Sequence, residues 1–135
     1  MTLAPEALHR ILAEGFPLVD CRVYRVAEAS AARLVLVRTI APVDLRPGGI
    51  VSGPVLMDLA DSAAWLHCIA RHGESARASV TTDLTMHFLA PARAEVRAEC
   101  THEGGTRGRE RFTVHLREAE TLIGLAHVGY AIRHE

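Results

Sequence analysis

Two aspartates, Asp58 and Asp61, lie three residues apart within a stretch that otherwise has the pattern of an apolar helix. A spacing of three residues puts both carboxylates on one face of that helix. A carboxylate on a mostly apolar helix loses part of its hydration, which suits it to proton transfer. Asp61 is therefore a candidate acid–base residue, whereas we expect Asp58 to face solvent. The structural alternative pairs Asp61 with an arginine across a subunit interface.

The start of the same helix offers a second chemical group. We expect Gly53 at the N-cap and Pro54 at the first helical position, where its missing N–H costs nothing. Apolar residues then recur at three- and four-residue steps until a stop near His72 and Gly73. Unpaired N–H groups and the helix dipole favour negative charge at such an N-terminus, so the Gly53 N–H is a candidate oxyanion donor.

The other elements must position this helix. An amphipathic pattern predicts a short helix from Pro5 to Glu14, and apolar alternation predicts six strands, at residues 19–23, 34–37, 80–88, 94–100, 112–116 and 122–132. This order predicts a single α+β domain over residues 1–135, with an antiparallel sheet wrapped around one long helix. Its edge strands stay free to pair with another copy. Gly124 and Gly129 in the last strand indicate a bulge or a close neighbour.

The composition narrows the classes of function. A formal net charge of -1 and a pI near 6.7 give no reason to expect a nucleic-acid or membrane surface. No apolar run approaches the roughly 20 residues that a membrane helix needs, and the N-terminus lacks the pattern of a signal peptide, so we expect a cytoplasmic protein. Three separated cysteines and dispersed histidines predict neither a disulfide nor a metal site.

Three motifs in succession resemble the hotdog-fold acyl-CoA thioesterases of the PaaI-like branch. The first, residues 49–63, resembles the glycine turn and helix of that family, with Ser-Gly-Pro at 52–54 in place of His-Gly-Gly. The second, residues 81–92, resembles the family's central strand and its Pro-Ala end. The third, residues 105–109, leads into the last two strands.

The resemblance implies a hotdog fold and a homodimer, often paired again into a homotetramer. It implies hydrolysis of an acyl- or aryl-CoA thioester, with coenzyme A as part of the substrate and no other cofactor. Asp61 matches the catalytic acid of the family, and would act as general base on water or as nucleophile. The Gly53 N–H of one subunit would hold the thioester oxygen in a site whose carboxylate comes from the other, because the family's sites lie at the dimer interface.

The loop before the helix departs from the family pattern. Ser52 stands where the family has histidine, and Arg46 where it often has asparagine. Ser52 can hydrogen-bond the substrate or a water but cannot shuttle a proton as imidazole does, and it is equally suited to cap the helix. Pro54 replaces the second glycine and removes one N–H, while that of Gly53 remains.

Further positions are candidates for substrate binding. Thr81 matches a hydroxyl that in relatives helps to hold the attacking water, and Thr82 should face the other side of the strand. Trp65 lies one turn beyond Asp61 and is either a wall of the acyl pocket or core packing. Arg107 and Arg109, in and after a Gly-rich turn, suit the phosphates of coenzyme A, although surface arginines on turns are usually only solvated.

Two other functions remain open at this point. A non-catalytic acyl-CoA-binding hotdog protein would explain the loss of the family's histidine and asparagine. A hydratase or dehydratase on the same fold ranks lowest, because those relatives use a histidine-containing motif that this sequence lacks.

Overall fold

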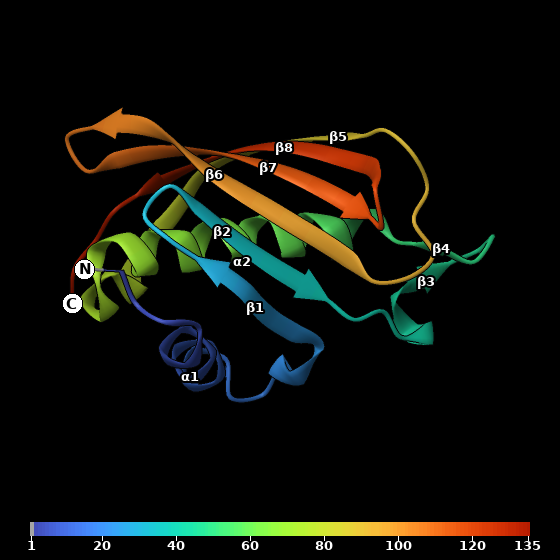
Figure 1. Ribbon diagram of the computed structural model, residues 1–135, viewed down its shortest axis with the longest axis horizontal. Coiled ribbons are helices and arrows are strands. Elements are labelled where there is room, and N and C mark those ends of the chain that lie inside the picture. Colours follow the sequence, from blue (N-terminus) through green and yellow to red (C-terminus); the bar gives the residue numbers. More distant parts are fainter. Residues whose placement is uncertain (1) are drawn as a thin grey trace.

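A six-stranded antiparallel sheet forms the body of the computed structural model, which describes residues 2–135 (Figure 1). The strands lie in the order β1-β2-β6-β7-β8-β5, so β1 and β5 are the edges. Their bounds are Tyr24–Ala29 (β1), Arg33–Arg38 (β2), Val80–Phe88 (β5), Val96–Thr106 (β6), Arg109–Glu118 (β7) and Thr121–Ala131 (β8). A separate hairpin pairs β3, Leu45–Arg46, with β4, Ile50–Val51.

The long helix α2, Gly53–His72, lies across one face of this sheet (Figure 1). Leu59, Ala63, Leu66 and Ile69 are fully buried along it, and they form the core with apolar side chains of the strands. The helix stops at Gly73, whose φ of 95° lies in the left-handed region that favours glycine. The predicted α+β class is therefore confirmed, with an antiparallel sheet around one long central helix, as in a hotdog fold.

The N-terminal helix α1, Pro5–Gly15, closes the side of the molecule beside β1 (Figure 1). Leu8, Ile11 and Leu12 form its buried face, as its amphipathic pattern predicts. No helix within residues 2–135 is long and apolar enough to cross a membrane.

The prediction of a strand at residues 19–23 is wrong. The Asp20 carboxylate accepts hydrogen bonds from the backbone N–H of Arg22 at 3.1 Å and from its guanidinium at 2.8 Å, which stabilises a 3-10 turn at Cys21–Val23. The strand begins only at Tyr24. The β3–β4 hairpin also lies in a segment predicted to be a loop, and α2 begins one residue earlier than predicted, with Ser52 as its N-cap.

A β-bulge at Thr82 interrupts β5. Thr81 is opposite Tyr130 on β8 and Asp83 is opposite Gly129, so one extra residue stands between the two pairs. Beyond the bulge Leu84 packs against the core, and strict alternation would turn Thr82 rather than Thr81 toward the helix. The bulge reverses that order and places Thr81 on the side of α2. The predicted bulge or close neighbour at Gly129 is thus confirmed.

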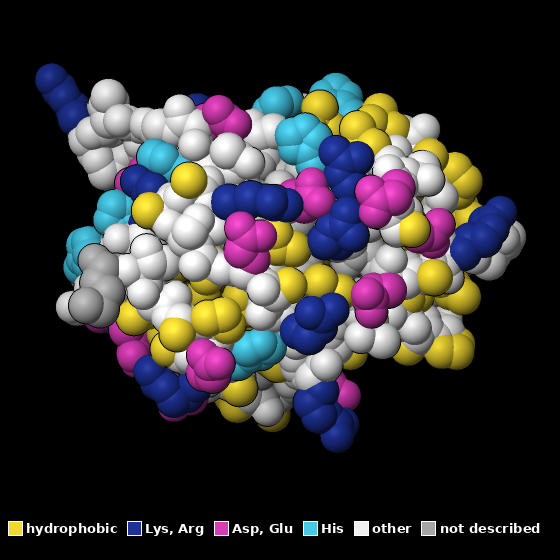
Figure 2. All heavy atoms as spheres, in the orientation of Figure 1, with side chains coloured by type: hydrophobic (Ala, Val, Ile, Leu, Met, Phe, Trp, Pro, Cys, Tyr) yellow, Lys and Arg dark blue, Asp and Glu magenta, His cyan; other side chains and the backbone are white. Residues whose placement is uncertain are grey.

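On the outer face, charged side chains cover the strands in compensating pairs. Arg111 forms two hydrogen bonds with Asp83, at 2.7 and 3.1 Å, and Glu99 pairs with Arg97 and Arg117. Figure 2 shows acidic and basic side chains side by side on the visible face of the molecule. This interleaving agrees with the net charge of -1.

Candidate active site

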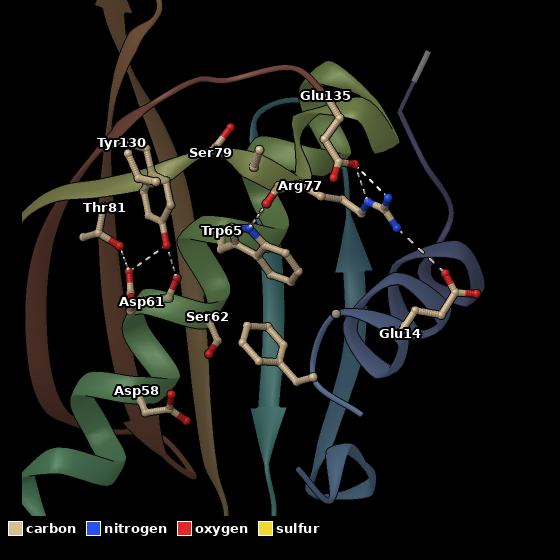
Figure 3. Close-up of a pocket in the computed structure, with 14 residues that line it drawn as sticks. Glu14, Asp58, Asp61, Ser62, Trp65, Arg77, Ser79, Thr81, Tyr130 and Glu135 are labelled. Carbon is tan, nitrogen blue, oxygen red and sulfur yellow. Dashed lines mark hydrogen bonds and ion pairs between the residues drawn. The ribbon is translucent and has the colours of Figure 1, made fainter. Parts of the chain in front are cut away.

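Asp61 projects from α2 into an open cavity of about 840 Å³ (Figure 3). Its Oδ1 atom accepts hydrogen bonds from the Thr81 hydroxyl at 2.8 Å and from the Tyr130 hydroxyl at 2.7 Å. Its Oδ2 atom has no hydrogen-bond partner among the residues that the structure describes. One oxygen of the carboxylate is thus fixed by the protein, while the other is free to contact a water or a substrate.

Tyr130 holds this carboxylate from the floor of the cavity. The side chain belongs to β8 and is only 3% exposed. Burial and the neighbouring Asp61 carboxylate raise the pKa of the Tyr130 phenol far above its usual range. The phenol therefore stays protonated at physiological pH and donates its hydrogen to Asp61.

Thr81 reaches the same carboxylate from the edge strand β5. It faces α2 because of the bulge at Thr82, whose own hydroxyl instead donates to Asp83 at 3.0 Å on the outer face. This arrangement agrees with the expectation that only one of the two threonines faces the candidate site. A hydroxyl beside a carboxylate can position a water that both groups bind.

Trp65 forms a wall of the Asp61 cavity and also ties neighbouring segments together. Its indole N–H donates to the carbonyl oxygen of Arg77 at 3.0 Å, and its ring meets Phe16 in an edge-on contact with 5.4 Å between centroids. Trp65 therefore packs against neighbouring segments and lines the cavity, while its role as a wall of the acyl pocket stays a prediction. The Arg77 guanidinium at the mouth is paired with Glu135 at 2.7 Å (Figure 3).

The second aspartate of the helix is held by the other tyrosine of the chain. Asp58 is exposed and lines the same cavity, and its Oδ2 atom accepts a hydrogen bond from the buried hydroxyl of Tyr24. Burial and the hydrogen bond to Asp58 raise the pKa of Tyr24 to about 12, so this phenol also remains a donor. Asp58 faces solvent as expected, but the hydrogen bond from Tyr24 fixes the orientation of its carboxylate.

Gly53 lines a different cavity, of about 450 Å³, at the N-terminus of α2. As the first residue of the helix it has an N–H with no carbonyl to bond within the helix. The Phe88 ring covers it, since a Cβ atom at Gly53 would lie 3.4 Å from that ring. Arg46, from β3, lines this cavity as well. The donor and the cation thus line the same cavity, which does not include Asp61.

The two cavities lie two helical turns apart. Gly53 and Asp61 are eight residues apart on α2, which corresponds to about 12 Å along its axis. One carbonyl oxygen cannot bond the Gly53 N–H while its carbon lies beside Asp61 of the same chain. Within one chain, Thr81 and Trp65 therefore lie at the Asp61 cavity, and Arg46 lies at the Gly53 cavity. The Asp61 carboxylate and the Gly53 N–H of one chain do not share a site.

Ser52 and Pro54 flank Gly53 without lining its cavity. Ser52 occupies the N-cap, but its side chain makes no capping hydrogen bond, so the helix start relies on the backbone there. Pro54 is exposed in the first turn, where its missing N–H leaves nothing unpaired. The role of Ser52 as a substrate contact stays a prediction.

Arg107 and Arg109 lie in and after the turn between β6 and β7, and both are exposed. Arg109 alternates with Glu110, which pairs with Arg71 of α2 on the helix side of the sheet, so Arg109 faces the outer side. Neither arginine lines the Asp61 or the Gly53 cavity. Their binding of coenzyme A phosphates stays a prediction.

Sequence reasoning missed the two tyrosines and Phe88. Tyr130 and Tyr24 approach α2 from strands far away in the chain, and no spacing in the sequence links them to the aspartates. One feature of the sequence could have indicated these contacts. A buried tyrosine hydroxyl needs a hydrogen-bond partner, and the only acidic residues of α2 are Asp58 and Asp61. Within residues 2–135, no group of three or more His, Cys, Asp or Glu side chains could hold a metal ion.

Comparisons with known proteins show the family and the fold. The family described as the thioesterase superfamily matches residues 48–122, which include the helix α2 and the strands β5, β6 and β7. No curated protein matches the chain in sequence.

Among solved structures, a thioesterase from Haemophilus influenzae is similar with a TM-score of 0.81 and 16% identity, over 99% of this chain and 93% of that one. A variant thioesterase from Pseudomonas aeruginosa has a TM-score of 0.82 and 15% identity, over 100% and 97%. A variant of the phenylacetic acid degradation protein PaaI from Thermus thermophilus has a TM-score of 0.75 and 20% identity, over 87% and 99%. At these identities the likeness shows the fold alone.

Proposed function

The chain belongs to the thioesterase superfamily, and from this premise we propose that it hydrolyses an acyl- or aryl-CoA thioester with Asp61 as the general base. The observation that supports this role is the Asp61 carboxylate itself. It stands in an open cavity, fixed through Oδ1 by two hydroxyl donors, with Oδ2 left free. A base of this kind needs a fixed orientation and room for both water and substrate.

The proposed step begins with a water beside Asp61 Oδ2 and Thr81. Asp61 takes a proton from this water as its oxygen attacks the thioester carbon, and the carbonyl oxygen becomes an oxyanion. The carbon–sulfur bond then breaks, and the proton held by Asp61 passes to the leaving thiolate. The products are the free acid and coenzyme A, and the carboxylate is regenerated.

The oxyanion donor in this proposal is the Gly53 N–H of a second copy. It is supported by the separation of about 12 Å between Gly53 and Asp61 on one helix, which excludes a shared site within one chain. It is also supported by the edge strand β5, nine residues long with exposed Val80 and Phe88. Such an edge pairs readily with another strand. We therefore propose a homodimer joined through β5, and the same strand carries Thr81.

Arg46 is proposed to bind the coenzyme A moiety, since it lies in the Gly53 cavity that would form the other half of each site. A guanidinium suits the phosphates of that group. Arg107 and Arg109 remain proposed phosphate contacts on the outer side of the sheet.

The proposal is tested by replacing Asp61 with Asn, which keeps the shape and removes the base. Thiol release from a panel of acyl-CoA and aryl-CoA thioesters should fall by about 10²- to 10⁴-fold, the usual contribution of a general base. Glu95→Gln is the matched control, because Glu95 is exposed and lines neither cavity. Size-exclusion chromatography should show the same oligomer for both variants.

Retained turnover in the Asp61→Asn variant would remove Asp61 from the mechanism. Tight binding of acyl-CoA to the unmodified protein without any thiol release would instead support the non-catalytic acyl-CoA-binding alternative.

A further inference from the structure

We propose that Asp58 and Tyr24 form a specificity site that selects short acyl groups carrying a hydroxyl on the β or γ carbon. This inference rests on the proposed thioesterase function and names the substrate class of the same cavity. Asp58 here is a binding residue and takes no part in the bond-breaking step.

The position of Asp58 relative to Asp61 sets where the hydroxyl must be. Both carboxylates line the same cavity, and Figure 3 shows both on the side of α2 that faces it. Side chains three residues apart on a helix have Cβ atoms about 5–6 Å apart. An acyl group that runs from Asp61 into the apolar recess beside Asp58 has its β and γ carbons next to Asp58.

The Asp58 carboxylate is held as a hydrogen-bond acceptor. The hydroxyl of Tyr24, which is 6% exposed, donates to Oδ2 from within the core. Oδ1 has no hydrogen-bond partner in the described part of the chain. A carboxylate in a fixed orientation favours a hydroxyl that the rest of the bound substrate already holds in place, because little further orientational freedom is lost when the hydrogen bond forms. A plain alkyl group would instead displace water from the carboxylate without replacing its hydrogen bond.

The charge of the cavity wall excludes one other class of substrate. Among residues 2–135 of one chain, four carboxylates line it, those of Glu14, Asp58, Asp61 and Glu135, and Arg77 supplies the only guanidinium. Arg46, which the second copy would add beside the oxyanion donor, is proposed to be occupied by the coenzyme A phosphates. Arg77 is paired with Glu135 at 2.7 Å and lies 4.0 Å from Glu14. Within residues 2–135, no cation lies within ion-pair distance of Asp58 or Asp61. An acyl group ending in a carboxylate would be repelled, whereas a neutral hydroxyl is accepted.

A small apolar recess limits the length of the acyl group. Behind Asp58 lies a cavity of about 70 Å³, lined by Leu12, Phe16, Val19 and Cys21 and closed by Tyr24, Asp58 and Ser62. The recess has less than a tenth of the volume of the 840 Å³ cavity around Asp61, so it receives only a small alkyl group. An acyl group that places a hydroxyl at the mouth of the recess, beside Asp58, and a methyl group inside it is a short hydroxyacyl group.

The test compares butanoyl-CoA, both enantiomers of 3-hydroxybutanoyl-CoA, and succinyl-CoA. We expect kcat/KM of one hydroxy enantiomer to exceed that of butanoyl-CoA at least tenfold, with succinyl-CoA the poorest. Asp58→Ala should bring the ratio of hydroxybutanoyl to butanoyl kcat/KM near one and should relieve the rejection of succinyl-CoA. Tyr24→Phe should lower the same ratio by loosening Asp58. Glu95→Gln should leave every ratio unchanged.

Non-hydrolysable thioether analogues of the same acyl groups, tested by equilibrium binding, keep the inference separate from the proposed reaction. A preference for the hydroxylated analogue that Asp58→Ala abolishes supports the specificity site even where no thioester is hydrolysed. Turnover with a hydroxyl-to-alkyl ratio near one, unchanged by Asp58→Ala, overturns the specificity site and leaves the thioesterase proposal standing. Equal binding of both analogues in the absence of turnover overturns it as well.

Discussion

Tyr130 and Asp61 are 69 residues apart in the chain, yet the Tyr130 phenol donates a hydrogen bond of 2.7 Å to the Asp61 carboxylate. The same relationship recurs one helical turn away between Tyr24 and Asp58. Both aspartates of α2 are thus oriented by phenols that the sheet supplies. The helix carries the two carboxylates, and tyrosines on the strands fix the orientation of each.

Removing the Tyr130 hydroxyl should impair the orientation of the base. In Tyr130→Phe the Asp61 carboxylate loses one of its two donors, and a hydrogen bond to a charged group contributes about 1.5–3 kcal/mol. We expect kcat to fall about ten- to hundredfold with little change in KM, and the thermal midpoint to fall by several degrees because a buried hydrogen bond is lost, measured by steady-state kinetics and calorimetry. Unchanged kcat would show that Thr81 alone orients Asp61.

Thr81→Val tests the other donor in the same assay, and Thr85→Val on the same strand is its matched control. Thr85 is exposed and lines neither cavity. A similar loss of kcat in both variants would indicate a general effect on β5 rather than on Asp61.

Gly53→Pro removes the Gly53 N–H. Ser52 has φ -68° and ψ 149°, a conformation that suits a residue before proline, and the first helical position tolerates proline. Residue 53 also precedes Pro54, which disfavours a helical conformation for a residue with a Cβ atom, so circular dichroism and size-exclusion chromatography must show that the helix and the oligomer are retained. With both retained, kcat should fall by about 10²- to 10³-fold, the effect of losing one oxyanion donor. Gly53→Ala keeps the N–H and makes the same contact with Phe88, so it should retain most activity.

Mixing the Gly53→Pro and Asp61→Asn chains extends this prediction to the dimer. Subunit exchange between the two inactive proteins should restore up to about a quarter of the original activity, because half of the dimers are mixed and each has one intact site. No recovery after confirmed exchange would place donor and base in one subunit.

The role of Asp61 as base rather than nucleophile can be read from oxygen isotopes. In a single turnover in H₂¹⁸O, with enzyme in excess, a general base delivers ¹⁸O directly into the acid product. A nucleophilic carboxylate would form a mixed anhydride with the acyl group, and water attacking the Asp61 carbon of that anhydride would leave ¹⁸O in Asp61 and ¹⁶O in the acid product. Water attacking the acyl carbon would label the product instead, so the anhydride is also trapped with hydroxylamine. We expect labelled product, an unlabelled Asp61 peptide by mass spectrometry and no hydroxamate at Asp61, and either ¹⁸O or a hydroxamate in that peptide would assign the nucleophilic role.

Buried His67 should make stability depend on pH. Burial lowers the pKa of His67 to about 4, and its Nε2 atom donates to the carbonyl oxygens of Ser30 and Ala31, at 3.1 and 3.2 Å. The unfolded chain takes up this proton near pH 6.5, whereas the folded protein does so only near pH 4. The free energy of unfolding should therefore fall by at most about 3 kcal/mol as pH decreases through this range.

Chemical denaturation between pH 4 and 7 measures this dependence. His67→Gln should flatten it, while His127→Gln, at an exposed position, should leave it intact. An equal slope in the wild type and in His67→Gln would assign the acid sensitivity to other groups.

Much of the fold could be predicted because its signals are local. The apolar period of α2, the stop at Gly73 and the alternation in β5 and β8 all act within a few residues. The first strand could not be predicted, since a side-chain cap by Asp20 favours a turn over an alternating pattern. Of the two hydrogen-bond donors to Asp61, one could be predicted from the sequence and the other could not. Thr81 was identified from a motif, whereas Tyr130 reaches Asp61 only through the order of strands in the sheet.

Residues on the outer surface of the sheet also bear on the orientation of Thr81 on its inner side. A Cβ atom at Gly129 would overlap the Asp83 carboxylate and lie 2.7 Å from the Thr82 hydroxyl, so any other residue there would displace both. Those two residues form the bulge that turns Thr81 toward Asp61. Position 129 and the Arg111–Asp83 ion pair therefore lie directly behind the segment that presents Thr81 to Asp61, and we expect substitutions there to act on the base without altering any group that contacts the substrate.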